Sequence, residues 1–232
     1  MAEGFFGERV AAHYDQRSGE ADPAMVDMLA ELAGEGAALE FAIGTGRVAR
    51  PLTQRGVRVV GIDNSAAMLK RLDPKIEAVE GDMTTTRLDQ EFTLVFLVFN
   101  TISNLTTQDA QVACFENAAA HLTQGGHFVI ENNVPALQSL PLGQTVLPFR
   151  ADPEGFSFDV YDAVTQRFSS QHFYIEDGKI TAYPVEFRYA WPAELDLMAR
   201  IAGLQLEHRY AGWRREPFTA VSPSHVSVYV KT

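Results

Sequence analysis

The chain is poor in cysteine, in positive charge and in long apolar runs. Its 232 residues include one cysteine, Cys114, which excludes a disulfide within the chain and fits a reducing, cytoplasmic setting. The formal net charge of -11 argues against nucleic acid as a partner, because binding to a phosphate backbone depends on clustered Lys and Arg. The longest apolar run, residues 94–99, is too short to cross a bilayer, so we expect no membrane association.

The apolar residues that are present make up 46% of the chain, which is enough for one sizeable core. We therefore expect a single domain over residues 1–232. Within it, residues 1–34 are expected to form a helical cap and residues 135–191 an inserted β segment. No internal repeat or low-complexity tract divides the sequence.

A predicted strand, a glycine turn and the start of a helix follow one another early in the chain. The apolar run at residues 37–43 is typical of a strand, and Gly44 and Gly46 permit a tight turn with close backbone approach to a ligand. Val48 and Ala49 begin a helical stripe, so unpaired N–H groups of a helix start are expected to face the turn. The turn also matches the dinucleotide pattern G-x-G-x-x-A, so it does not identify the ligand by itself.

Three acidic residues lie at the ends of three consecutive predicted strands. Glu40 lies near the first strand end, where a carboxylate can reach the turn backbone or an amino group of a ligand. Asp63 follows the strand at residues 57–62, in the position from which a carboxylate accepts both hydroxyls of a ribose. Asp82 follows the strand at residues 76–80 and can accept from an adenine amino group. Together the three acids predict a nucleoside site.

These residues resemble the cofactor motifs of class I S-adenosylmethionine-dependent methyltransferases. The family's motif, acid-x-Gly-x-Gly-x-Gly, falls on Glu40, Ala42, Gly44 and Gly46, with alanine in place of the first glycine. The resemblance implies an α/β fold, with a Rossmann-like, doubly wound sheet of seven strands whose last strand is antiparallel. It also implies S-adenosyl-L-methionine as cofactor and S-adenosyl-L-homocysteine as its product, and it covers residues 5–134 best.

The resemblance further implies which residues contact the cofactor. Gly44 and Gly46 are expected beside its methionine end, Asp63 at the ribose, and Asp82 with Met83 at the adenine. Tyr14 belongs to a Tyr-Asp pair similar to one in the N-terminal cap of related methyltransferases, so it is expected to face the methyl-transfer pocket. The predicted cofactor residues are Tyr14, Glu40, Ala42, Gly44, Gly46, Arg47, Asp63, Asn64, Met68, Gly81, Asp82, Met83 and Phe99.

The sequence of the loop after the apolar strand at residues 92–99 distinguishes between methyltransferases with different substrate classes. It lacks the acid-or-Asn, Pro, Pro, aromatic motif with which enzymes acting on nucleic-acid bases hold the target nitrogen. Its Phe-x-x-Ile-x-x-Leu pattern is similar to the loop of aminosugar N-methyltransferases, some of which have histidine where this chain has Asn104. Asn104 can orient a substrate but is not a base at neutral pH. Tyr14 and Asn104 are the candidate catalytic residues, and no catalytic metal is expected, since Asn100 is not an acid.

Residues 135–191 change to an alternating pattern rich in aromatics. Strands are expected at residues 156–161, 167–175 and 179–189, with Asp177-Gly178 as a hairpin turn. They would form an antiparallel β lid after the fifth strand, and a homodimer interface fits the same pattern. The candidate substrate residues are Asn104, Asn132, His172 and Tyr174.

These features predict methyl transfer to a nitrogen or oxygen of a small, fairly apolar acceptor, by in-line attack on the cofactor's methyl group. A neutral amine needs no base and a hydroxyl usually benefits from one, so the lack of an evident Asp/His pair favours an amine or a readily ionised hydroxyl. Two alternatives stay open. One is an NAD(P)-dependent oxidoreductase, although no Tyr-x-x-x-Lys pair is present, and the other is a cofactor-binding protein without catalysis.

Overall fold

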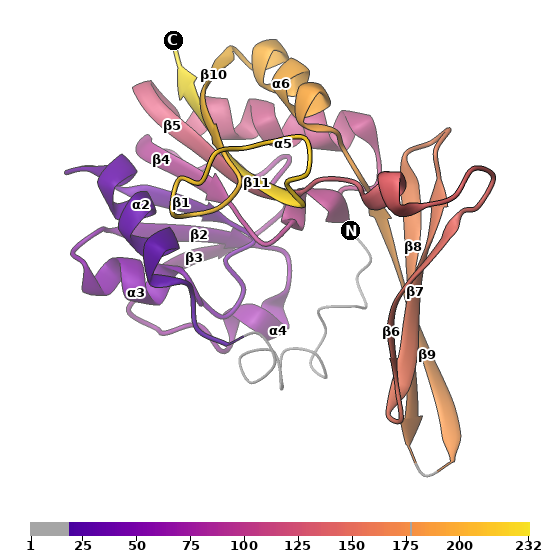
Figure 1. The fold of residues 1–232 in the computed structure, drawn as a ribbon. Coiled ribbons are helices and arrows are strands. Elements are labelled where there is room, and N and C mark those ends of the chain that lie inside the picture. Colours follow the sequence, from indigo (N-terminus) through magenta and orange to yellow (C-terminus); the bar gives the residue numbers. More distant parts are fainter. Residues whose placement is uncertain (1–18, 177) are drawn as a thin grey trace.

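Two β-sheets carry the fold, and the computed structural model describes residues 19–176 and 178–232 (Figure 1). The main sheet has seven strands in the order β10-β11-β5-β4-β1-β2-β3. Strands β1 to β5 pair in parallel, whereas the last strand, β11, runs antiparallel to β5 and β10, which confirms the predicted fold class. The strands of the main sheet are β1 (Ala38–Phe41), β2 (Val59–Asp63), β3 (Glu77–Glu80), β4 (Phe92–Leu97), β5 (Leu122–Asn133), β10 (Leu204–Tyr210) and β11 (Ser224–Lys231).

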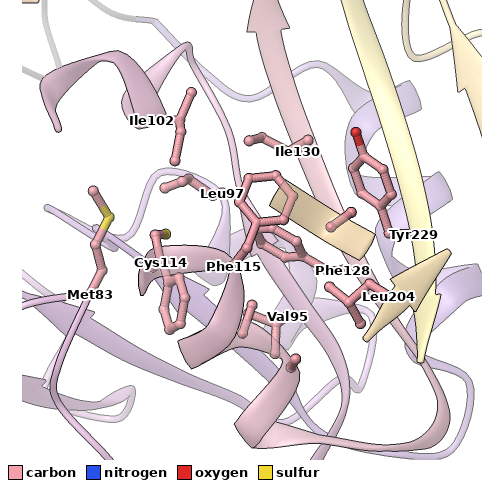
Figure 2. Close-up of a cluster of buried hydrophobic side chains, with 14 of the residues drawn as sticks. Met83, Val95, Leu97, Ile102, Cys114, Phe115, Phe128, Ile130, Leu204 and Tyr229 are labelled. Atoms are coloured by element: carbon pink, nitrogen blue, oxygen red, sulfur yellow. The ribbon is translucent and has the colours of Figure 1, made fainter. Parts of the chain in front are cut away.

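Helices cover both faces of the main sheet. α2 (Pro23–Ala33) and α3 (Ala49–Gln54) pack on one face, and α5 (Gln108–His121) and α6 (Pro192–Ile201) pack on the other. Figure 2 shows the buried cluster on the α5 side, where the rings of Phe115 and Phe128 meet edge-on with centroids 5.0 Å apart. Burial from both sides explains why β4 is apolar almost throughout.

An aspartate followed by a proline predicts a helix start at Asp22 and Pro23, and the helix α2 begins there. The Asp22 carboxylate accepts a hydrogen bond from the Ala24 N–H at 2.9 Å, and Pro23 occupies the first turn. The apolar stripe is buried, with Met28 and Leu29 against the sheet. None of the helices in the described part of the chain has the length and apolar character that a membrane crossing requires.

Two helices differ in extent from their predictions. Asn64 and Ser65 predict a capped helix that continues through Leu72, but the structure has a single turn, α4 (Ala66–Leu69), in which the Ser65 hydroxyl accepts from the Met68 N–H. The sequence predicts a long amphipathic helix over residues 106–122 that stops near Gly125 and Gly126, but α5 ends at His121 and passes directly into β5. The two glycines therefore lie within the span of the strand rather than at a helix stop.

The second sheet, here called the lid sheet, is antiparallel and is inserted between β5 and α6. In Figure 1 it stands to one side of the main sheet as a long arm. The sequence predicted three of its strands and missed the first, because Pro148 interrupts the alternation. That strand lies at the edge of the sheet, where a register shift between Pro148 and Arg150 accommodates the proline. The strands are β6 (Val146–Asp152), β7 (Gly155–Asp162), β8 (Arg167–Glu176) and β9 (Lys179–Arg188), and the predicted turn residue Asp177 lies outside the described residues.

A buried polar network fixes the base of the lid sheet. Arg188, at the end of β9, donates to the Glu194 carboxylate of α6 at 2.6 Å and to the Gln111 side chain of α5 at 2.5 Å. Gln111 donates in turn to the carbonyl of Ile102 at 3.2 Å, in the short helix η1 (Thr101–Asn104) that follows β4. Burial opposes ionisation of Glu194, but hydrogen bonds led by that of Arg188 outweigh it and lower the pKa of the carboxyl. The lid sheet is therefore tied to the loop that leaves the centre of the main sheet.

Candidate active site

The carboxyl ends of four neighbouring strands form one edge of the main sheet. β4, β1, β2 and β3 are adjacent and parallel, so the residues that follow them meet at this edge. The three acids Glu40, Asp63 and Asp82 come from the ends of β1, β2 and β3. The topology thus brings together the acids that the sequence predicted to share a site.

The glycine turn after β1 has a left-handed backbone at three alternate residues. The φ angles are 54° at Ala42, 57° at Gly44 and 81° at Gly46. At Gly46 a Cβ would also lie 2.5 Å from the end of the Leu72 side chain, which would have to shift. Alanine at position 42 adopts a backbone conformation that favours glycine, so the departure from the family motif has an unfavourable effect on the backbone.

Asp63 ties the end of β2 to the glycine turn. One carboxylate oxygen accepts from the Gly44 N–H at 2.7 Å and the other from the Ser65 N–H at 2.8 Å. Burial raises the pKa of Asp63, and the two N–H donors act in the opposite direction. The carboxylate is thus fixed against the glycine turn at the end of β2.

Glu40 is more deeply buried than Asp63, with 3% of its surface exposed. Burial, followed by the charge of Asp63, raises the pKa of Glu40 well above its ordinary value, while the Ala49 N–H at the start of α3 and the Arg47 charge counteract them. Its Oε2 atom is buried and has no hydrogen-bond partner among the described residues. A buried carboxylate oxygen with spare bonding capacity is what a ligand amino group at this turn requires.

The end of β3 presents Asp82 but not the side chain that follows it. Asp82 Oδ1 accepts from both the N–H and the hydroxyl of Thr84, at 2.8 and 2.7 Å, so the carboxylate is held in place. Met83 is buried in the core cluster of Figure 2, and Met68, after β2, is buried as well. The Met83 thioether, which was predicted to contact the adenine, is therefore buried in the core and not exposed at this edge.

The loop after β4 is bent sharply and is held by Glu131, for which the sequence indicates no specific role. Phe99 and Asn100 both have a φ of 58°, which is uncommon for residues other than glycine. The Glu131 carboxylate at the end of β5 accepts from the Phe99 N–H and from the Trp213 indole, each at 2.8 Å. The Arg47 guanidinium lies 3.4 Å from the centre of the Phe99 ring, so it links this loop to the glycine turn.

A pocket of ≈ 610 Å³ lies between this loop and the lid sheet. We call it the lid pocket. Asn100, Ser103 and Asn133 contribute to it from the main sheet, and residues 220–223 from the connection between β10 and β11. The lid sheet contributes Leu147, Phe149, Asp159, Tyr161, Phe168, Ser170 and Phe187, and Tyr189 follows directly after its last strand. Apart from Asp159 and Ser170, this side is aliphatic or aromatic, which suits an acceptor with a large apolar surface.

The predicted substrate residues lie around the lid pocket rather than in its wall. Asn104 donates to the Thr101 carbonyl at 3.1 Å, and Asn132 is buried beneath the pocket, whose wall contains the next residue, Asn133. His172 hydrogen-bonds to the pocket residue Ser170 at 3.2 Å, and Tyr174 lies further along the same strand. Tyr14 lies outside the described residues.

Comparison with known proteins identifies the family. A family model described as a methyltransferase domain matches residues 38–126. A cypemycin N-terminal methyltransferase from a Streptomyces species is 31% identical over 192 residues, covering 79% of this chain and 78% of that protein. The CcbJ methyltransferase from Streptomyces caelestis is 35% identical over 100% of both chains, with a TM-score of 0.86. The chain belongs to the S-adenosylmethionine-dependent methyltransferases.

The fold of this methyltransferase also recurs in more distant structures. An amino pentose methyltransferase from Micromonospora echinaspora, solved with S-adenosylmethionine bound, has a TM-score of 0.71 over 95% of each chain at 21% identity. Family membership makes S-adenosylmethionine the cofactor and sets aside the oxidoreductase and the non-catalytic alternatives. Among the described residues, no group of three or more His, Cys, Asp or Glu side chains is arranged to hold a metal ion.

Proposed function

We propose that this methyltransferase transfers the methyl group to an amine nitrogen of a small acceptor with a large apolar surface. The observation that carries the proposal is the lid pocket, which joins the loop after β4 to the aromatic face of the lid sheet. Because Asn100 follows β4 at the carboxyl edge, the pocket begins beside the proposed cofactor site and extends under the lid sheet. An acceptor bound there has its apolar body against aromatic rings and one end near that edge.

We propose that the edge where β4, β1, β2 and β3 end holds the cofactor, with carboxylates that accept hydrogen bonds from its amino and hydroxyl groups. Glu40 has a carboxylate oxygen available for an amino group, Asp63 is aligned for ribose hydroxyls, and Asp82 for an adenine amino group. The tight turn at Gly44 and Gly46 lets the backbone approach closely. Bound here, S-adenosylmethionine supplies an electrophilic methyl group on a positively charged sulfur.

The preference for nitrogen rests on what the loop after β4 offers the acceptor. Asn100 and Ser103, which face the lid pocket from this loop, are neutral, and neither is a base at neutral pH. A neutral amine can attack without losing a proton first, so positioning alone accounts for much of the rate enhancement. The relative named as a cypemycin N-terminal methyltransferase supports the same preference, since its name describes methylation of an N-terminus.

The test is methyl transfer from isotopically labelled S-adenosylmethionine to a panel of amines paired with their hydroxyl analogues. We expect labelled N-methyl products, identified by mass spectrometry and by the chemical shift of the new methyl group. Asp63→Ala should abolish binding of S-adenosylhomocysteine in calorimetry, whereas Asp89→Ala, which removes an exposed acid, should leave it unchanged. Methyl groups found only on oxygen would overturn the preference for nitrogen.

A further inference from the structure

The wall of the lid pocket contains one carboxylate, that of Asp159, and the described structure gives it no counter-ion. Asp159 lies on β7 between its cross-strand partners Leu147 and Ser170, which also face the pocket. Its Oδ2 atom accepts from the Tyr161 hydroxyl at 3.3 Å. Its Oδ1 atom is shielded from solvent and has no hydrogen-bond partner among the described residues.

The arginines nearest to this wall are engaged elsewhere. Arg150 pairs with Asp152 at 2.6 Å, and Arg188 pairs with Glu194 at 2.6 Å, so neither neutralises Asp159. His172 lies on the neighbouring strand, hydrogen-bonded to Ser157 and Ser170. Burial lowers the pKa of His172, with the charge of Asp159 acting in the opposite direction, and this lowered pKa favours a neutral ring.

An uncompensated carboxylate among aromatic side chains is energetically unfavourable unless a cation joins it. A ligand ammonium group supplies both the missing charge and a hydrogen-bond donor for Oδ1, and charge-assisted bonds of this kind are about twice as strong as neutral ones. The rings of Phe168 and Phe187, which also line the pocket, offer π faces that attract cations.

We propose that Asp159 binds a positively charged amino group of the acceptor. This inference rests on the proposed function in one respect, that the lid pocket is the acceptor site. It adds that the acceptor carries a second amino group, distinct from the neutral amine that accepts the methyl group, and that Asp159 of the lid sheet recognises the positive charge of this second group. A second role for Asp159, that of fixing the Tyr161 hydroxyl, predicts no preference between charged and neutral ligands.

The experiment measures binding of two probes of equal shape, phenethylamine and 2-phenylethanol, to the protein saturated with S-adenosylhomocysteine. We expect wild-type protein to bind the amine more tightly than the alcohol. Asp159→Asn keeps a side-chain oxygen for Tyr161 and removes the charge, and it should weaken amine binding about tenfold or more while leaving alcohol binding unchanged. Glu186→Gln, which removes an exposed carboxylate from β9 outside the pocket, is the matched control and should bind both probes as the wild type does.

Equal amine affinity in wild type and Asp159→Asn would overturn the inference. So would a wild-type protein that binds neither probe or prefers the alcohol, and this comparison stands even if the variant does not fold. Because no methyl transfer takes place in the assay, the result is independent of the atom methylated. N-methylation unaffected by Asp159→Asn would refute this inference alone, and O-methylation with a charge-dependent affinity would refute only the proposed nitrogen preference.

Discussion

The main sheet and the lid sheet place their buried side chains differently. All residues of β1 and β2 are buried, because helices cover both faces of the main sheet. In the lid sheet, β6 has no fully buried residue, and Phe156 stays exposed although it stacks on Phe173 with ring centroids 4.6 Å apart. The main sheet thus derives its stability from two-sided packing, whereas the lid sheet depends on strand pairing and on the network at its base.

This difference separates two tasks. The edge where β4, β1, β2 and β3 end is the proposed cofactor site and is here called the cofactor edge. Cofactor binding there requires backbone turns and carboxylates held in fixed positions, which a sheet packed on both faces provides. In the proposed function, only one face of the lid sheet has to match an acceptor, so we expect its side chains to contribute to binding more than to folding. Four predictions test this separation, in order of decreasing size.

Truncation of matched aromatic residues in the two sheets is expected to give the largest contrast. Phe96 of β4 is 0% exposed, so Phe96→Ala should lower the free energy of unfolding by about 3–5 kcal/mol. Phe149 of β6 is 52% exposed and faces the lid pocket, so Phe149→Ala should change stability by about 0.5 kcal/mol or less and raise the KM for the acceptor. Urea unfolding and steady-state kinetics provide the two readouts. Similar losses of stability in both variants would contradict the separation.

Removal of the arginine at the base of the lid sheet should have the next largest effect. Arg188→Ala leaves Glu194 and Gln111 without their shared partner, and we expect the free energy of unfolding to fall by about 3 kcal/mol. The control is Arg167→Ala, which breaks an exposed pair with Glu186 and should cost about 1 kcal/mol or less. Urea unfolding measures both. Equal effects of the two variants would show that the buried network does not anchor the lid sheet.

The buried carboxylate at the cofactor edge should make stability depend on pH. The pKa of Glu40 is raised in the folded protein above the ordinary value of 4.5, so the folded state binds more protons than the unfolded state above pH 4.5. Its contribution to stability therefore falls as pH rises from 4.5 toward the raised pKa, with a slope of at most about 1.4 kcal/mol per pH unit. Glu40→Gln should remove this slope.

Unfolding in urea at a series of pH values from mildly acidic to neutral tests the Glu40 prediction. Glu91→Gln, which changes an exposed residue, is the control and should keep the wild-type slope. Parallel pH profiles for wild type and Glu40→Gln would contradict the assignment of a raised pKa.

The smallest effect is expected at the first position of the glycine motif. Ala42 has a φ of 54°, so Ala42→Gly relieves an unfavourable backbone conformation and should raise the free energy of unfolding by about 1 kcal/mol. The same change at the exposed helical residue Ala120 should lower it by about 1 kcal/mol. Thermal and urea unfolding measure both. If Ala42→Gly is destabilised instead, the packing of the Ala42 methyl group stabilises the protein by more than the unfavourable φ angle costs.

Local signals predicted those elements whose ends and burial patterns are set by nearby residues. The helix α2 has its cap and proline at the positions that its sequence indicates. The missed strand β6 contains Pro148, whose cost depends on whether the strand lies at the edge of a sheet. That position is a property of the assembled lid sheet and not of the segment.

Side-chain direction was harder to predict than strand position. A shift of one residue moves a side chain to the opposite face, and this separates the buried Asn132 from the pocket residue Asn133. Glu131 gains its role from the Phe99 backbone and from the Trp213 indole, which lies 82 residues further along the chain. No local pattern reports such a contact.

The sequence by itself predicted that three acids share one edge of the main sheet. Glu40, Asp63 and Asp82 follow three strands of a parallel sheet, and the carboxyl ends of such strands meet at one edge whatever surrounds them. The lid pocket was decided only by the tertiary structure. Its wall combines the loop after β4, the end of β5, the lid sheet and residues 220–223, and which side chains face the cavity depends on strand register and on how the lid sheet docks.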